Sequence, residues 1–123
     1  MPKHFSPSIC FLISRLVSTA QSDPLVGHWE GGLNRLGAIQ LLRFDIYSKG
    51  DSIWATYDDP AAAVFNAPFF DLKKINDTLQ MNFGYGKFKA ILHKEVNEIT
   101  GTNKGWNPRL ELHMRKYGCC ALF

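Results

Sequence analysis

Hydrophobic and polar residues alternate with a period of two along most of the chain after residue 25. In one such segment, Leu42, Phe44 and Ile46 are separated by the charged residues Arg43 and Asp45. This alternation indicates half-buried strands of an antiparallel sheet, because successive side chains of a strand point to opposite faces. The segments with strand character are 26–33, 40–47, 53–57, 69–75, 79–83, 88–92, 99–105 and 110–114.

Gly, Asn, Asp and Pro residues separate these segments and predict short turns. After the first residues of the chain, no window of about ten residues or more shows the period of an α-helix. About eight strands joined by short turns predict an all-β fold, an antiparallel up-and-down β-barrel of the lipocalin-like type. In a closed barrel the first and last strands are neighbours, and no sheet edge is left exposed. A two-sheet sandwich of the same strands is the alternative.

The longest irregular stretch covers residues 58–68 and begins with Asp58-Asp59-Pro60. We expect it to hold a short helical turn or to form a lid over the barrel. Asp58-Asp59-Pro60 itself is typical of a turn or a helix cap, and the alternative is a loop that meets a partner domain.

Residues 1–22 have the outline of a secretory signal peptide. Lys3 and His4 form a basic start, Ile9–Ile13 is apolar, and Ala20 and Ser22 have the spacing of a cleavage site. A disordered or weakly helical leader is the alternative, because Arg15 interrupts the apolar stretch. We therefore expect a leader over residues 1–22, a barrel domain over 23–116 and an unstructured tail over 117–123. An exported protein, periplasmic or extracellular, is the predicted localisation.

Composition and charge exclude several classes of function. The 123 residues are 46% hydrophobic and 20% charged, which fits one globular domain and no separate catalytic domain beside it. The chain has 14 basic and 11 acidic residues, and two of the basic residues lie in the leader, so the rest carries 12 − 11 = +1. Without a stripe of Lys and Arg, nucleic acid is not an expected partner. Arg15 also leaves no apolar stretch long enough to span a membrane.

The sequence gives little support for catalysis or for a cofactor. A nucleophile elbow, G-x-S-x-G, is absent, and only Ser48 and Ser52 follow the leader. The three cysteines have no spacing typical of zinc ligands. We therefore predict a non-enzymatic protein without a cofactor.

Several short motifs resemble a known family. Residues 27–33 read G-x-W-x-G-x-L, and residues 86–92 follow G-x-F-x-G-x-L except for one position. Ile99-Thr100-Gly101-Thr102 and the closing strand at residues 110–115 complete the order. This order resembles a lipocalin-like β-barrel domain of exported Bacteroidota proteins. That domain usually precedes an α/β-hydrolase, or serine hydrolase, domain and also occurs alone.

The resemblance covers about 90 residues, from Leu25 to Arg115. Two positions depart from it: Ala90 stands where the second glycine of its motif is expected, and Asn103 stands where a tryptophan is common. The resemblance implies no catalytic residues in the barrel.

Two groups of residues are candidates for a site. The first is an apolar ligand site formed by interior side chains and by aromatic residues near an opening, and the alternative is a solid core with Trp29 closing the base. Its members are Trp29, Phe44, Phe65, Phe69, Phe70, Met81 and Phe88.

The second group would lie on the outer face, where the first and last strands meet. His28, Glu30, Glu111 and His113 offer two imidazoles and two carboxylates, which suit a divalent metal. Ordinary cross-strand polar pairs are the alternative, and we favour them over a metal site.

These observations leave three hypotheses for function. The first is a non-catalytic accessory or interaction module, whose partner is a hydrolase domain or another protein. The second is a carrier of a small apolar ligand held in the barrel. The third is a fragment of a secreted α/β-hydrolase.

Overall fold

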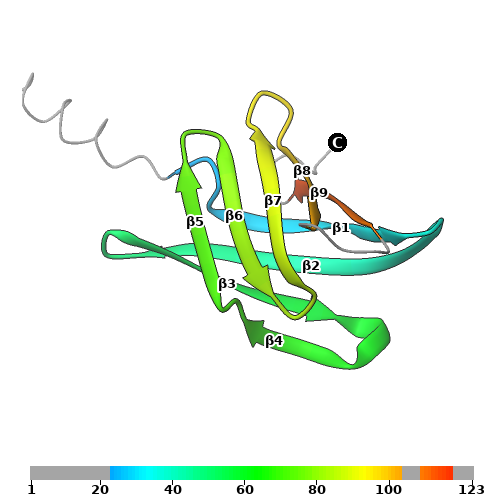
Figure 1. Ribbon diagram of the computed structural model, residues 1–123. Helices are drawn as coiled ribbons and strands as arrows, with labels where there is room; N and C mark the ends of the chain where they lie inside the picture. The colour runs from blue at the N-terminus through cyan, green and yellow to red at the C-terminus, as the bar shows by residue number, and fades with distance from the viewer. Residues whose placement is uncertain (1–22, 104–108, 118–123) are drawn as a thin grey trace, which may run out of the picture.

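The computed structural model describes residues 23–103 and 109–117, and it contains one nine-stranded sheet (Figure 1). All its strand pairs are antiparallel. The strands are β1 (Gly27–Arg35), β2 (Ala38–Lys49), β3 (Ser52–Asp59), β4 (Val64–Pro68), β5 (Asp71–Ile75), β6 (Thr78–Phe83), β7 (Gly86–His93), β8 (Glu98–Asn103) and β9 (Leu110–Tyr117). The predicted leader at 1–22 lies outside the described residues. The tail was predicted to begin at residue 117, but Tyr117 is the last residue of β9, and residues 118–123 lie outside the described residues.

The sheet curls into a barrel-like shape, in which β3 near one edge of the sheet contacts β5 at the other edge (Figure 1). β1 lies between β2 and β9, in the order β4-β3-β2-β1-β9-β8-β7-β6-β5. The all-β antiparallel fold is therefore confirmed, and the sandwich alternative is wrong because every described strand belongs to one sheet. No ladder among the described residues joins β4 to β5, but Phe69 N donates to Ala55 O and Phe70 N donates to Asn82 O. These two bonds tie the connection between the edge strands to β3 and β6.

Glycines allow the sheet to curl this strongly. A Cβ at Gly31 would overlap the backbone of His113 and Met114 on β9. A Cβ at Gly101 on β8 would lie 2.6 Å from Ala90 Cβ on β7. Both positions therefore need a residue without a side chain where two strands approach closely.

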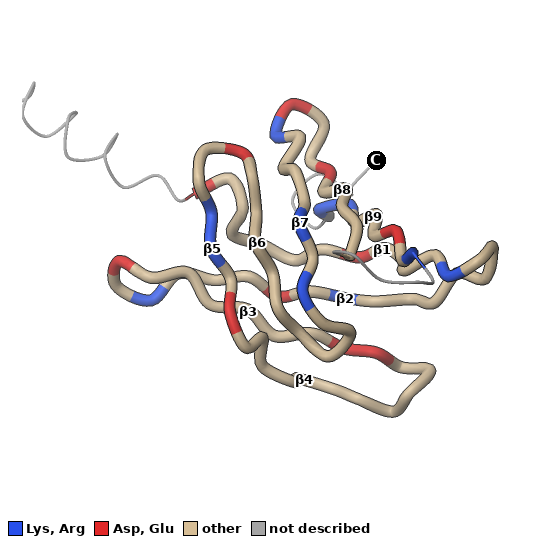
Figure 2. Tube along the Cα trace, in the orientation of Figure 1, with Lys and Arg blue, Asp and Glu red and all other residues tan. Residues whose placement is uncertain are grey.

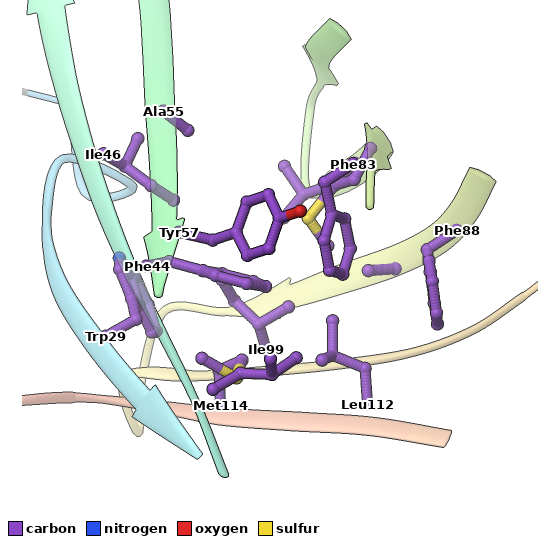
Figure 3. Packing of buried hydrophobic residues seen from close by; sticks show 14 of the residues in the cluster. Trp29, Phe44, Ile46, Ala55, Tyr57, Phe83, Phe88, Ile99, Leu112 and Met114 are labelled. Atoms are coloured by element: carbon purple, nitrogen blue, oxygen red, sulfur yellow. The ribbon is translucent and has the colours of Figure 1, made fainter. Parts of the chain in front are cut away.

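The interior is filled by the side chains that the alternation assigned to it. Phe83 has more ring partners than any other described residue. Its ring centroid lies 5.3 Å from that of Phe44 and 5.2 Å from that of Phe88 (Figure 3), and 5.0 Å from that of Phe69. Trp29 is fully buried and donates from Nε1 to Leu25 O at 2.9 Å. Edge-to-face and stacked ring pairs of this kind add to the free energy gained from burial.

The stretch at residues 58–68, predicted to be irregular, is the main difference from the expected fold. It contains the end of β3, a 3-10 turn at Pro60–Ala62 and the edge strand β4. The expected helical turn is present, but the ninth strand was missed because its five residues end in Pro68 and carry no alternation of apolar residues. Asp59 is the N-cap residue of this turn and Pro60 begins it, but no side-chain hydrogen bond caps the turn. Asp58 Oδ1 instead accepts a hydrogen bond from Asn66 N on β4.

Candidate functional site

Asp59 is the buried charged residue of the described part of the chain, with an exposed fraction of 2%. It ends β3, where Ala55, Tyr57 and Asp59 share the inward face. A carboxylate removed from water in this way requires hydrogen bonds to its oxygens, because burying an unpaired charge costs several kcal/mol or more.

Gln40 and Tyr85 satisfy both oxygens of Asp59. Gln40 Nε2 donates to Oδ1 at 2.8 Å and to Oδ2 at 2.9 Å, and Tyr85 Oη donates to Oδ2 at 2.5 Å. Gln40 Nε2 also lies 2.5 Å from Tyr85 Oη. These three residues, called here the Asp59 cluster, join the start of β2, the end of β3 and the turn between β6 and β7.

The environment of the Asp59 cluster keeps Tyr85 protonated. Burial raises the pKa of Tyr85 to about 12, and the hydrogen bond to Asp59 and its negative charge act in the same direction. A general acid or base works best with a pKa near the operating pH. The cluster therefore favours a structural role, holding three strand ends together at one end of the barrel.

The residues predicted for an apolar ligand site do not surround one opening. Trp29, Phe44, Met81 and Phe88 are buried in the shared core. Phe69 packs against that core, with its ring 5.1 Å from Phe44. Phe65 and Phe70 point away from it, with exposed fractions of 61% and 73%.

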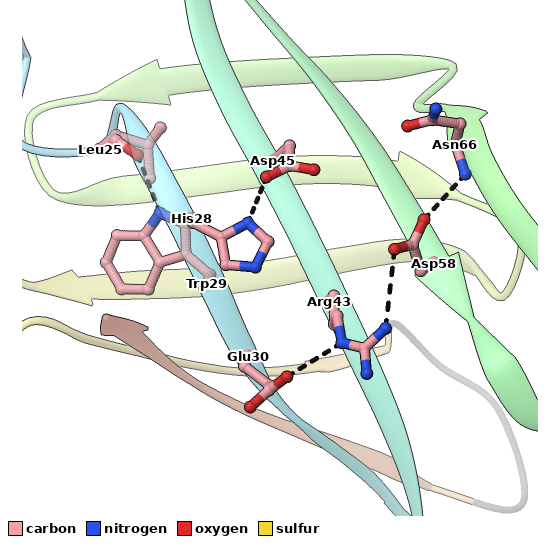
Figure 4. A network of polar contacts seen from close by, with 8 residues as sticks. All are labelled: Leu25, His28, Trp29, Glu30, Arg43, Asp45, Asp58 and Asn66. Atoms are coloured by element: carbon pink, nitrogen blue, oxygen red, sulfur yellow. Dashed lines mark hydrogen bonds and ion pairs between the residues drawn. The ribbon is translucent and has the colours of Figure 1, made fainter. Parts of the chain in front are cut away.

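The register separates the four residues that were candidates for a metal site. On β9, Glu111 lies opposite Asn34 and His113 lies opposite Gly32, further along β1 from Glu30 and His28. His28 Nδ1 instead contacts Asp45 Oδ1 on β2 (Figure 4), and His113 Nε2 lies 3.3 Å from Glu98 Oε1 on β8. Among residues 23–103 and 109–117, no group of three or more His, Cys, Asp or Glu side chains could hold a metal ion.

A row of alternating charges crosses the outer face instead. Directly opposed positions on β3, β2, β1, β9 and β8 carry, in order, Asp58, Arg43, Glu30, Arg115 and Glu98, called here the charged row. Arg43 Nε donates to Glu30 Oε2 at 2.9 Å and Arg43 Nη1 lies 3.9 Å from Asp58 Oδ2 (Figure 4). Cross-strand pairs of opposite charge of this kind favour one register of the sheet over others.

The pKa of Glu98 shows the effect of this arrangement. Arg115 Nη2 donates to Glu98 Oε2 at 2.8 Å. This bond, and then the contact with His113, lowers the pKa of Glu98 below its usual value.

Exposed apolar side chains gather beside the Asp59 cluster. Leu36 in the turn after β1 and Ile39 on β2 have exposed fractions of 84% and 74%. Leu41 follows on the same outer face of β2, and β2 contacts the 3-10 turn at Pro60–Ala62. Apolar groups exposed together mark interaction surfaces more often than isolated ones do. We call Leu36, Ile39, Leu41, Ala61 and Ala62 the apolar end.

Sequence reasoning missed both the Asp59 cluster and the apolar end. The alternation placed Tyr57 on the inward face of its strand, so extending that strand by two residues would have placed Asp59 inward as well. Its partner Tyr85 was assigned to a turn, and no local signal connects the two. Ile39 lies just before the expected strand at 40–47. The prediction therefore did not place it on the same sheet face as Leu41.

Comparisons with protein-family models, with curated proteins and with solved structures found no match to this chain. The resemblance to the lipocalin-like barrel domain therefore stays an expectation drawn from its motifs. Within the described residues, none of the elements is a helix with the length and apolar character needed to cross a membrane.

Proposed function

We propose that this chain is a non-catalytic, exported interaction module that binds a partner protein or domain through the apolar end. The observation that carries the proposal is the exposure of Leu36, Ile39 and Leu41 together beside the hydrogen-bonded Asp59 cluster. Loss of such apolar area from water is the main favourable contribution to protein association. The resemblance described above makes a serine hydrolase domain the first partner to test.

The interior supports the same proposal. An apolar ligand carried in the barrel would have to share space with Phe44, Phe83 and Phe88, whose rings already contact one another. The carrier function is therefore the weaker candidate.

Site-specific photo-crosslinking in the native host tests the proposal. A benzophenone amino acid replaces Ile39 in one variant and Val96 in a control, because Val96 is also exposed but lies in the turn between β7 and β8. We expect one defined protein to be cross-linked from position 39 and not from position 96, and Leu36→Ser with Leu41→Ser to abolish the product. Equal products from both positions, or none from position 39, would contradict the proposal.

Export is tested separately. We expect the chain in the periplasmic or extracellular fraction, with an N-terminus at Asp23 after cleavage behind Ser22. An intact Met1 start in the cytosolic fraction would contradict that part of the proposal.

A further inference from the structure

A hollow of about 360 Å³ lies on the outer face of β5, β6 and β7. Its polar lining residues form two cross-strand rows, because Lys73 pairs with Gln80 and Gln80 with Lys89, while Asp71 pairs with Asn82 and Asn82 with Lys87. We call this hollow the lysine groove. Its polar residues are Asp71, Lys73, Gln80, Asn82, Lys87 and Lys89.

Three ammonium groups border the lysine groove from both sides. Strands are spaced by roughly 4.8 Å, so Lys73 and Lys89 are about 10 Å apart at the backbone, and Lys87 lies about 7 Å from Lys89 along β7. Long, flexible lysine side chains can converge on one group across such distances. Figure 2 shows the basic residues of β5 and β7 on either side of β6, which has no charged residue.

The charge of the lysine groove is not neutralised within the described chain. Lys73 Nζ lies 3.9 Å from Asp71 Oδ2, a distance at which the attraction is weak, and no described acidic residue forms an ion pair with Lys87 or Lys89. On the charged row, by contrast, Arg43 and Arg115 both hold carboxylates at 2.9 Å or less. The groove thus has a net positive charge available for an anion.

The remaining polar residues of the groove fit a ligand that also carries hydroxyl groups. The side-chain amides of Gln80 and Asn82 lie between the lysines on the middle strand and can both donate and accept hydrogen bonds. Asp71 stands at one corner, where it accepts hydrogen bonds from hydroxyls and disfavours a second anionic group. The volume lies at the lower end of the range for small-molecule sites.

We infer that the lysine groove binds a sugar that carries a phosphate or sulfate ester. The ester lies among Lys73, Lys87 and Lys89, and the sugar hydroxyls bond to Asn82, Gln80 and Asp71. This inference is independent of the apolar end, which lies on other strands, so either site can fail without the other.

Titration of the full chain, labelled with nitrogen-15, tests the inference at low ionic strength. The probes are glucose 6-phosphate, glucose 6-sulfate, glucose and inorganic phosphate. We expect backbone amide shifts concentrated on β5–β7 with at least one of the two esters, and at least tenfold weaker binding of glucose and of inorganic phosphate. Binding of inorganic phosphate as tight as that of the esters, or no saturable shift with either ester, would overturn it.

Matched variants distinguish specific binding at the lysine groove from nonspecific attraction of an anion to surface lysines. Lys87→Gln with Lys89→Gln should weaken ester binding by tenfold or more, because each removes a charge-assisted hydrogen bond. Lys94→Gln removes a charge outside the groove and should leave the affinity within twofold. Equal losses in both variants would overturn the assignment to this site.

Asp71→Asn provides a readout that a loss of folding would not produce. It should strengthen binding of inorganic phosphate and reduce the preference for the sugar ester, since it removes both the repulsive charge and the strongest hydroxyl acceptor. An unchanged preference would contradict the role given to Asp71.

Discussion

Tyr85→Phe tests the Asp59 cluster by removing one hydroxyl and keeping the ring. The ring contact with Phe83, at a centroid distance of 6.2 Å, is retained, while Asp59 Oδ2 loses the donor at 2.5 Å. A hydrogen bond to a charged group contributes about 1.5–3 kcal/mol. Gln40 still donates to both oxygens of Asp59, so we expect the lower part of this range, about 1.5–2 kcal/mol.

Thermal and urea unfolding at pH 7, followed by circular dichroism, measure this loss. For a domain of this size, each kcal/mol lowers Tm by roughly 4–8 °C, so the variant should melt roughly 6–16 °C below the parent. Tyr47→Phe is the matched control, because Tyr47 is exposed on β2, and its Tm should change little. A Tyr85→Phe Tm within the range of the control would refute the reasoning.

The pH dependence gives the same prediction a second, independent readout. The pKa of Tyr85 is raised to about 12 in the fold from 10.0 for the unperturbed phenol. Its contribution to stability is fully present below pH 10 and is lost as pH rises toward 12, because the unfolded chain releases this proton first. The parent should therefore lose more stability than Tyr85→Phe between pH 10 and 12, and parallel curves would contradict the assignment.

Three further variants test other parts of the structure. Glu98→Gln should reduce the loss of stability at acid pH. The pKa of Glu98 is lowered, so its contact with Arg115 stabilises the fold above the usual carboxyl range and is lost as pH falls. If urea unfolding shows the same loss of stability at acid pH in the parent and the variant, the charged row does not contribute as described. Gly31→Ala should cost about 3 kcal/mol or more, because its Cβ would overlap the β9 backbone. Gly32→Ala should cost less, about 1 kcal/mol, because its Cβ would press on a methyl group of the exposed Ile39 side chain and lie 3.5 Å from the nearest backbone atom, Gln40 O. Equal losses in the two variants would refute the role given to Gly31 in the curl of the sheet. Phe83→Ala should cost about 3–5 kcal/mol because its ring packs against those of Phe44, Phe69 and Phe88, and a loss below about 1 kcal/mol would show that the interior is loosely packed.

The alternation of residues predicted the sheet well because burial on one face is a local property of each strand. Leu42, Phe44 and Ile46 are all buried as their spacing indicated. The turn residues Gly, Asn, Asp and Pro also predicted where most strands end. The first and last strands were expected to be neighbours, and β1 pairs with β9. Strand β4 was not predicted because an irregularity in its pairing with β3, with Asn66 at a positive φ, breaks the period of two, so that Val64 and Ala67, three residues apart, both pack against the core.

The candidate sites were harder to predict, because they depend on the register between strands from distant parts of the chain. The alternation predicted that His28 and His113 point outward. It did not predict that His28 contacts Asp45 and that His113 contacts Glu98, because these partners lie on other strands. In the same way, Lys73 and Lys89 both alternate outward, yet only the pairing of each with Gln80 places them on one groove.

We propose that this barrel acts through its outer surface, because aromatic and aliphatic side chains occupy its interior. Native mass spectrometry of the protein purified from its host, together with a lipid screen by thermal shift, tests the claim most directly. We expect a mass without a retained apolar molecule and no rise in Tm with any lipid. A small apolar molecule that survives desalting, and raises Tm when it is added back, would contradict it.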